Sequence, residues 1–233
     1  MAAVDLRLAD HGPVVYRHPR WRPLVIGHPI RDNLRHKGVT ETSIAITHKR
    51  ALPWLVILVV LAATAYQLRS QGRLWWCSCD YLLLWSGDAW SSDNSQHLFD
   101  PYTFTHLLHG FVLCGLLALV VPRLSAPWQL SIAVSIEAFW EMVENSEFVI
   151  RRYREETAAL GYHGDTIVNS LGDVLACGLG FVLARRLGFR RTLALYVVTE
   201  VVLAFWIRDN LTLNVLMLIY PSEAIKAWQA AGH

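Results

Sequence analysis

The chain has 233 residues, of which 54% are hydrophobic and 17% are charged, and its formal net charge is +2. Its mean hydropathy of +0.31 is high for a water-soluble protein, and its ten tryptophans suit the aromatic belts of a membrane protein. The sequence contains no zinc-finger, P-loop or dinucleotide-binding motif, and its basic residues lie in a tail and at the ends of apolar segments, which argues against nucleic-acid binding.

Residues 1–50 are polar, contain four prolines, and carry nine Lys and Arg and five His. This composition predicts a cytoplasmic tail that is largely disordered. Residues 51–68 are the first apolar run and are long enough to span a bilayer. Ala63-Thr64-Ala65 resembles a signal-peptidase site, but the 50-residue leader favours an uncleaved anchor.

A polar loop, residues 69–102, carries four tryptophans, which suggests that it lies on the membrane surface. Its Cys77-Ser78-Cys79 motif is too closely spaced for an unstrained disulfide between the two cysteines. The pair could bind a metal, form a strained redox pair, or do neither. Cys114 and Cys177 lie in apolar runs and are predicted to be small core residues.

Further apolar runs follow, and they predict spans at residues 104–121, 128–150, 166–187 and 192–207, with a polar loop at 151–165. Residues 210–220 are only about half a bilayer long, which predicts a re-entrant or interfacial segment followed by an amphipathic helix over 222–229. A kinked sixth span over 210–229 is the alternative. We therefore expect an all-α fold, with residues 51–233 forming a polytopic transmembrane bundle of five or six spans.

The distribution of Lys and Arg predicts the orientation of these spans. With the N-terminus in the cytoplasm, the inner segments carry fourteen of them: nine in the tail, Arg123, and the group Arg185, Arg186, Arg190 and Arg191. The outer segments carry six, namely Arg69, Arg73, Arg151, Arg152, Arg154 and Arg208. This bias predicts a multi-pass protein of the bacterial inner membrane whose N-terminus is cytoplasmic.

Three glutamates lie in the third predicted span. Glu137, Glu141 and Glu144 fall within about 60° of one another on a helix. One ionised carboxylate at bilayer depth costs about 2.5–3.5 kcal/mol on an insertion scale, so three on one stripe should face a protein interior with partners.

Two other spans place polar groups at the same depth. His106 and His109 share a face near the start of the second span, and Asp165, Asn169 and Asp173 share a face at the start of the fourth. Because consecutive spans alternate in direction, these groups and the glutamates converge on one side of the membrane in either topology.

Imidazole and carboxylate groups together suit Zn, Fe or Mn, and they also suit a general acid/base pair. A divalent metal is therefore a candidate cofactor, with His106, His109 and Glu141 as ligands. The candidate catalytic acids and bases are Glu137, Glu141, Glu144, Asp165 and Asp173. A buried polar network that only holds the bundle together is the structural alternative.

Other polar residues around this cluster are candidates for binding a substrate: Asn145, Asn169, Arg151, Arg152, Arg154 and His97. The arginines could clamp a phosphate or carboxylate, but contact with lipid headgroups and salt bridges to Glu155 and Glu156 explain them equally well. Glu200 in the fifth span is an isolated acid that could join the network, pair with an arginine, or stay protonated.

Several motifs occur in a fixed order along the chain. They are WCSC at 76–79, NSQH at 94–97, DPYTFTHLLHGF at 100–111, EAFWEMVEN at 137–145, GDTIVNSLGD at 164–173 and RDNLTLN at 208–214. Together they resemble the bacterial inner-membrane family called domain of unknown function 2585, over roughly residues 54–229. A departure is Asp80, where the family pattern would have Gly after the cysteine pair. The resemblance implies a location and a fold but no reaction.

A more distant similarity, to VanZ-like membrane proteins, rests on the order of the Asp, His, Glu and Asp-x-x-x-Asn-x-x-Gly elements. It would imply biology of envelope lipids or glycopeptides. The leading hypothesis is an envelope enzyme that acts on a lipid or lipid-linked substrate, with membrane lipids as its partners. A structural or assembly protein is the second hypothesis. A proton-coupled carrier is the third, and the nearly apolar inner halves of the spans count against it.

Overall fold

The computed structural model describes residues 35–157 and 161–231, with side chains from Arg50 onward. The described residues fold into helices and irregular segments, and their one β feature is an isolated bridge between Trp85 and Phe99. The helices are α1 Arg35–Ser70, α2 Thr103–Val120, α3 Ala126–Glu144, α4 Glu147–Glu156, α5 Ile167–Leu187, α6 Phe189–Trp206, α7 Leu211–Ile219 and α8 Glu223–Ala230. The predicted all-α fold is confirmed.

The chain divides into two compact units, residues 1–45 and residues 46–233, and the candidate site lies in the second. The prediction of a disordered tail falls mostly on residues 1–34, which lie outside the described residues. Residues 35–50 are helical, so α1 begins at Arg35 rather than at residue 51.

The third predicted span was too long. The helix α3 ends at Glu144 instead of residue 150, and α4 begins three residues later. The side chain of Ser146 caps α4 by accepting a hydrogen bond from the Val149 amide, at 3.4 Å. Residues 151–156, predicted as loop, belong to α4, because the charged pairs in this segment are spaced i, i+4 and support a helix.

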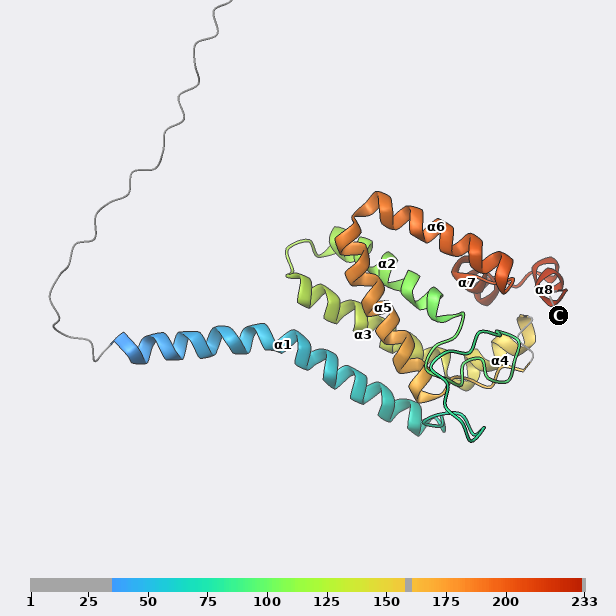
Figure 1. Ribbon diagram of the computed structural model, residues 1–233, viewed down its shortest axis with the longest axis horizontal. Coiled ribbons are helices and arrows are strands. Elements are labelled where there is room, and N and C mark those ends of the chain that lie inside the picture. Colours follow the sequence, from blue (N-terminus) through green and yellow to red (C-terminus); the bar gives the residue numbers. More distant parts are fainter. Residues whose placement is uncertain (1–34, 158–160, 232–233) are drawn as a thin grey trace, which may run out of the picture. The chain divides into compact units, whose positions relative to one another are not determined.

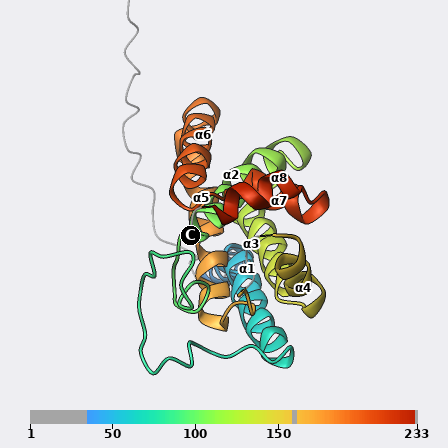
Figure 2. The same ribbon diagram turned by 90° about the vertical axis from the view of Figure 1, so that its right-hand side faces the viewer.

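The helices α2, α3 and α5 lie side by side (Figures 1 and 2). Two glycines allow the backbones of α2 and α5 to approach closely where the helices cross. A Cβ on Gly110 would lie 2.1 Å from the Cys177 carbonyl oxygen, and a Cβ on Gly180 would lie 2.1 Å from the Leu107 carbonyl oxygen. Small residues allow such backbone approach between membrane helices.

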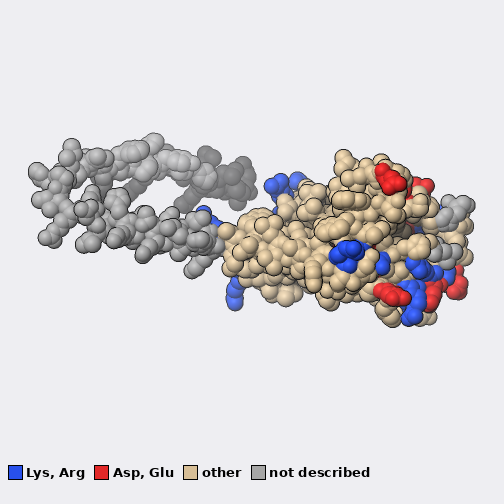
Figure 3. All heavy atoms as spheres, turned by 90° about the horizontal axis from the view of Figure 1, so that it is seen from below, with Lys and Arg blue, Asp and Glu red and all other residues tan. Residues whose placement is uncertain are grey.

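One end of this three-helix group is a dry apolar core built by Leu113, Leu117, Ala133, Cys177 and Phe181. On the outside of the bundle many large apolar side chains are exposed, including Leu119, Phe139, Leu179, Val198 and Phe205. On the face drawn in Figure 3 the acidic side chains gather toward one end, and most of the rest carries no charge. Such a surface is compatible with lipid contact.

Three of the described helices are long and apolar enough to cross a membrane: residues 50–70 of α1, α2, and α5. A fourth crossing exists if α6 and α7, which meet at a bend of 72°, form one broken span. The helix α3 is not among them. Its glutamates lower its hydropathy, and two of them, Glu137 and Glu141, are buried by the surrounding protein.

The bend after α6 has a clear physical cause. Glu200 of α6 accepts hydrogen bonds from the backbone amides of Leu211 (3.0 Å) and Thr212 (3.1 Å) at the start of α7. Its carboxylate thus satisfies two free amides at a helix N-terminus, where negative charge is favoured. Of the three predicted possibilities for this acid, none included this capping role.

The long loop 71–102 docks on the start of α5. The backbone amides of Ile167 and Val168 donate to the carbonyls of Leu74 (2.8 Å) and Trp75 (3.0 Å). Farther along the loop, Trp85 stacks on Trp206 of α6 at a ring distance of 6.1 Å. The loop therefore covers the polar end of α5 and places its own residues beside the candidate site.

Candidate functional site

Glu137 lies at the centre of the polar end and joins α2 to α3. Its Oε1 lies 2.6 Å from Nδ1 of His106 and 2.9 Å from Nδ1 of His109, and the carboxylate is almost fully buried. These are hydrogen-bond distances, and two ligands of one metal ion would stand farther apart. Glu137 therefore accepts from both Nδ1 atoms and leaves each Nε2 free to act as a ligand or base.

Several carboxylate oxygens near His106 lack a hydrogen-bond donor, although Oε1 of Glu144 accepts from the Tyr153 hydroxyl at 3.0 Å. Both carboxylate oxygens of Glu141, Oε2 of Glu144 and Oδ1 of Asp173 are buried without a hydrogen-bond partner among the described residues. The Oε1 atom of Glu141 lies 3.2 Å from Nδ1 of His106, which is within ion-pair distance. The Nδ1 proton of His106 is already donated to Glu137, so it does not form a hydrogen bond with Glu141. Unpartnered carboxylate oxygens are costly when buried, so they call for a positive partner.

Two sets of potential ligands meet at His106. A ring nitrogen of His106 and one oxygen each of Glu141 and Glu144 lie within 4.8 Å of one another. On the other side, Nε2 of His106 lies 3.9 Å from Oδ2 of Asp173. His106, His109 and Glu137 also satisfy the same distance limit, but their hydrogen bonds account for them. The arrangement has the chemistry of a divalent-cation site with oxygen and imidazole ligands.

The cluster opens into a cavity of about 1120 Å³. Its walls include side chains from α2, α3 and α5, notably His106, His109, Glu144, Asn169 and Asp173, and residues of the loop 71–102 and of α7. Glu137 and Glu141 do not line the cavity and stand behind His106. A cavity of this size exceeds the usual range for small-molecule sites and could hold part of a large amphiphilic molecule.

Asp165 lies in the cavity wall and is held by two neighbours. Its carboxylate accepts from Nδ2 of Asn145 (2.9 Å) and from the Tyr162 hydroxyl (3.0 Å), and its amide donates to Oδ1 of Asn145 (2.7 Å). Burial raises the pKa of Asp165 above the usual aspartate value, and the bonds from Asn145 and Tyr162 oppose this rise. Asn145 does not line the cavity, so it positions Asp165 rather than contacting a ligand.

Asp100 ties the loop to α5. It accepts from the backbone amides of Ser95 (2.9 Å) and Tyr102 (2.7 Å) and from Nδ2 of Asn169 (3.2 Å). Burial raises the pKa of Asp100, while the two backbone hydrogen bonds lower it. Sequence reasoning treated Asp100 only as part of a motif and missed this role.

Two further residues escaped prediction because they come from the broken segment after α6. Asp209 accepts from the Tyr102 hydroxyl at 3.3 Å, and Asn214 accepts from the Tyr153 hydroxyl at 2.8 Å. Both line the cavity. The signal was present, because the stripe argument made for residues 137–144 applies equally to polar residues inside the apolar segment 208–220.

The candidate substrate-binding arginines lie outside the cavity wall. Arg151 is exposed and 4.0 Å from Glu155, Arg152 pairs with Glu156 at 3.4 Å, and Arg154 donates to the Tyr162 carbonyl. These contacts match the salt-bridge alternative for Arg151 and Arg152. His97 is fully buried beside Asp93 and does not line the cavity either.

Residues 68–231 match the family model described as "Protein of unknown function (DUF2585)". A UPF0314 protein of Rhizobium meliloti is 48% identical over 185 residues, which cover 78% of this chain and 93% of the relative. A UPF0314 protein of Paracoccus denitrificans is 46% identical over 81% of this chain and 97% of the relative, and one of Brucella anthropi is 45% identical over 76% and 89%.

The chain therefore belongs to this uncharacterised bacterial family, as its motifs indicated. No solved structure matches the chain. The distant similarity to VanZ-like proteins stays a prediction.

Proposed function

We propose that this protein is a divalent-cation-dependent enzyme of the bacterial inner membrane that acts on an amphiphilic or lipid-linked substrate. The observation that carries the proposal is the group of buried carboxylate oxygens of Glu141, Glu144 and Asp173 that have no hydrogen-bond donor among the described residues. They surround His106 at the wall of a large cavity.

A cation explains this arrangement better than a structural network does. A network that only joins helices would satisfy its own acceptors, because unpartnered buried groups lower stability. Glu137 shows the satisfied case, since it accepts from two imidazoles. The unpartnered oxygens of Glu141 lie near Nδ1 of His106 and Asp173 lies near its Nε2, and a divalent cation among them would neutralise them.

The cavity supports the choice of substrate class. It is large, it combines ionisable groups with Leu74, Trp140, Leu211 and Met217, and it lies between helices whose outer faces suit lipid. A headgroup would meet the ionisable wall, and an acyl or prenyl chain would meet the apolar wall. The excess of Lys and Arg in the segments proposed as inner supports a cytoplasmic N-terminus and a site toward the outer leaflet.

The chemistry follows from the residues that face the cavity. A bound cation would act as a Lewis acid or lower the pKa of a bound water. His109 and Glu144 line the cavity with ionisable groups and are the candidates for proton transfer to or from the substrate. Asp165 and Asn169 would orient the headgroup through their carboxylate and amide. The proposal is thus hydrolysis or group transfer at a polar headgroup.

The first test measures the cation itself. The full-length protein, purified in detergent and carrying Cys77→Ser and Cys79→Ser, is incubated with Mn²⁺ or Zn²⁺, desalted, and measured by mass spectrometry for bound metal. We expect about one ion per chain, reduced at least about tenfold by Glu141→Gln and by Asp173→Asn, since each removes a charged ligand. Glu155→Gln, an exposed acid on α4, is the matched control and should retain the metal.

Two results would contradict the proposal. If the folded protein bound neither metal, the proposed cation site would be ruled out. Metal retained by both Glu141→Gln and Asp173→Asn would place it elsewhere. The substrate class is tested separately in cells that lack this gene and carry either the wild-type or the Glu141→Gln protein. A lipid that accumulates only with Glu141→Gln supports the enzyme, and identical lipid profiles favour a structural or assembly role.

A further inference from the structure

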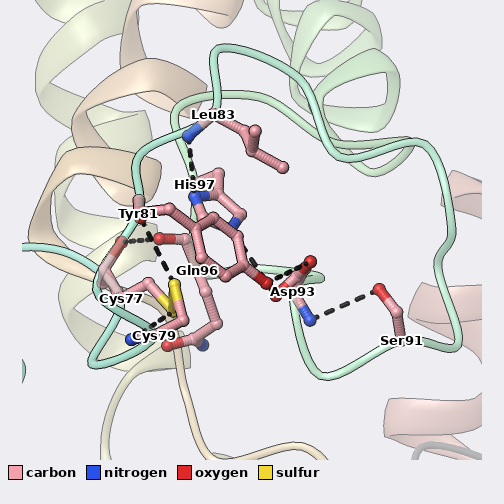
Figure 4. The surroundings of a disulfide bond; sticks show 9 residues. Cys77, Cys79, Tyr81, Leu83, Ser91, Asp93, Gln96 and His97 are labelled. Atoms are coloured by element: carbon pink, nitrogen blue, oxygen red, sulfur yellow. Dashed lines mark hydrogen bonds and ion pairs between the residues drawn. A yellow bond between two sulfur atoms is a disulfide. The ribbon is translucent and has the colours of Figure 1, made fainter.

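The cysteine pair in the loop lies in the same cavity wall but forms a separate group. Cys77 and Cys79 are joined by a disulfide, and both are half-buried and line the cavity (Figure 4). Their sulfurs, a ring nitrogen of His97 and an oxygen of Asp93 lie within 4.8 Å of one another. Such a set of side chains suits either a metal ion or thiol–disulfide chemistry.

His97 distinguishes the two possibilities. The backbone amide of Leu83 donates to its Nδ1 at 3.2 Å, so the neutral ring carries its proton on Nε2. The Nε2 atom is buried, lies 3.6 Å from Asp93, and has no hydrogen-bond partner among the described residues. A nitrogen that carries a proton donates a hydrogen bond and cannot be a metal ligand. This tautomer therefore favours thiol–disulfide chemistry over metal binding.

The contacts of Asp93 also favour thiol–disulfide chemistry over metal binding. Its two carboxylate oxygens accept from the Tyr81 hydroxyl, at 2.7 and 2.9 Å, and the Tyr81 ring stacks on His97 (Figure 4). These contacts account for the position of Asp93 without a metal ion. The tyrosine therefore holds the carboxylate and the imidazole in place beside the disulfide.

The two sulfurs are not equivalent. The amide of Cys79 donates to the sulfur of Cys77 at 3.1 Å, whereas the sulfur of Cys79 faces the carbonyl oxygen of Tyr81 at 3.3 Å. A backbone N–H stabilises a thiolate, and a carbonyl suits a protonated thiol. When the pair is reduced, Cys77 is therefore the better thiolate and Cys79 the better thiol.

We propose that Cys77 and Cys79 form a redox-active pair that oxidises a dithiol entering the cavity. A thiolate of the dithiol attacks the sulfur of Cys79, the disulfide breaks, and Cys77 leaves as a thiolate held by the Cys79 amide. The second thiolate of the dithiol then attacks the mixed disulfide and releases Cys79. The dithiol becomes a disulfide, and the two electrons and two protons it loses reduce and protonate Cys77 and Cys79. The Nε2–H of His97, beside the sulfurs, can donate a hydrogen bond to the thiolate that forms.

The position of the pair suits this activity. Only one residue separates the cysteines, so the bond closes a very short loop and adds little loop-closure stabilisation to the fold. Both sulfurs are accessible from a cavity that a ligand could enter, unlike Cys177, which is buried in the core. The inference is independent of the proposed cation site, which uses other residues.

The experiment uses the full-length protein in detergent and follows each cysteine by alkylation and peptide mass spectrometry. Dithiothreitol should reduce the pair in the folded protein, and, after its removal, oxidised glutathione should restore the disulfide, with Cys177 unmodified throughout. In separate variants, Cys79→Ser should leave a Cys77 thiol that reacts with an aromatic disulfide reagent at least about tenfold faster near pH 7 than the Cys79 thiol left by Cys77→Ser. The pH at which the reaction is half-maximal should be lower for Cys77.

His97→Leu tests this hydrogen-bond donor. It should slow oxidation of dithiothreitol by the disulfide and change its pH–rate profile, while the amount of disulfide in the purified protein stays the same. Equal reaction rates and pH profiles for Cys77 in the Cys79→Ser variant and Cys79 in the Cys77→Ser variant would overturn the proposal. So would a disulfide that dithiothreitol reduces only after unfolding, or free thiols that hold a stoichiometric Zn²⁺ in the purified wild-type protein.

Discussion

The two ends of the α2–α3–α5 group are built from the same helices but differ in how they treat polar atoms. At the apolar end, Gln129 donates to the Val121 carbonyl (2.9 Å) and accepts from Arg185 (2.8 Å), so its buried amide is satisfied. At the polar end, both carboxylate oxygens of Glu141 and Oδ1 of Asp173 remain without donors among the described residues.

This difference distinguishes buried polar groups that stabilise the fold from those that we expect to bind a ligand. The fold can satisfy a buried polar side chain where only packing is at stake, and it leaves charged oxygens unpartnered where a ligand would bind. Groups that lower stability and yet persist are typical of binding and catalytic sites. We therefore expect substitutions at the apolar end to change stability and those at the polar end to change ligand binding.

The largest effect on stability should come from the apolar core. Phe181 is 1% exposed in that core, and Phe181→Ala should lower the free energy of unfolding by about 3–5 kcal/mol because it leaves a cavity. Metal bound per folded chain should not change. Phe205→Ala is the control, because Phe205 is 85% exposed on α6. Denaturant unfolding in detergent measures both, and equal losses would contradict the assignment of the core.

The helix crossing gives the next effect. Gly110→Ala places a methyl group 2.1 Å from the Cys177 carbonyl oxygen and should cost about 1–3 kcal/mol of stability through overpacking. Gly115 lies on the same helix with nothing within 4 Å of an added Cβ, so Gly115→Ala should be neutral or stabilising by up to about 1 kcal/mol. If both variants were equally stable, the close crossing would be wrong.

A smaller effect should follow from the helix cap outside the three-helix group. Glu200→Gln retains one acceptor for the two α7 amides but loses the charge, so it should lower stability by about 1 kcal/mol. The helix α7 carries Asn214 into the cavity wall. If the cap only stabilises α7, Glu200→Gln should leave metal binding unchanged. Glu155→Gln on exposed α4 should change stability by less than about 0.5 kcal/mol.

Much of this arrangement could be predicted from the sequence. The glutamate stripe, the histidine pair and the Asp165–Asp173 face gave the convergence of α2, α3 and α5, because helical periodicity and alternating spans depend only on the sequence. Family membership followed from the ordered motifs.

Other features could not be predicted, because they depend on contacts between distant segments. The end of α3 at Glu144 follows from a cap at Ser146, and the role of Glu200 requires α7 to turn back on α6. The separation of Glu137 from the other acids also needed distances, since periodicity alone made the three glutamates equivalent. Asp209 and Asn214 were missed because a short, broken apolar segment gives no long periodic signal.

The smallest expected change in stability provides the sharpest test of the comparison. In protein without bound metal, Glu141→Gln should alter the free energy of unfolding by less than about 1 kcal/mol, or raise it. His106, at 3.2 Å from Glu141, keeps its shorter bond to Glu137, and Glu141 stands near the acids Asp173 and Glu144. Thermal unfolding with and without Mn²⁺ measures this, and Mn²⁺ should stabilise the wild-type protein but not the variant. A loss as large as that of Phe181→Ala would make Glu141 part of the structural core and would favour a non-catalytic polar network over a cation site.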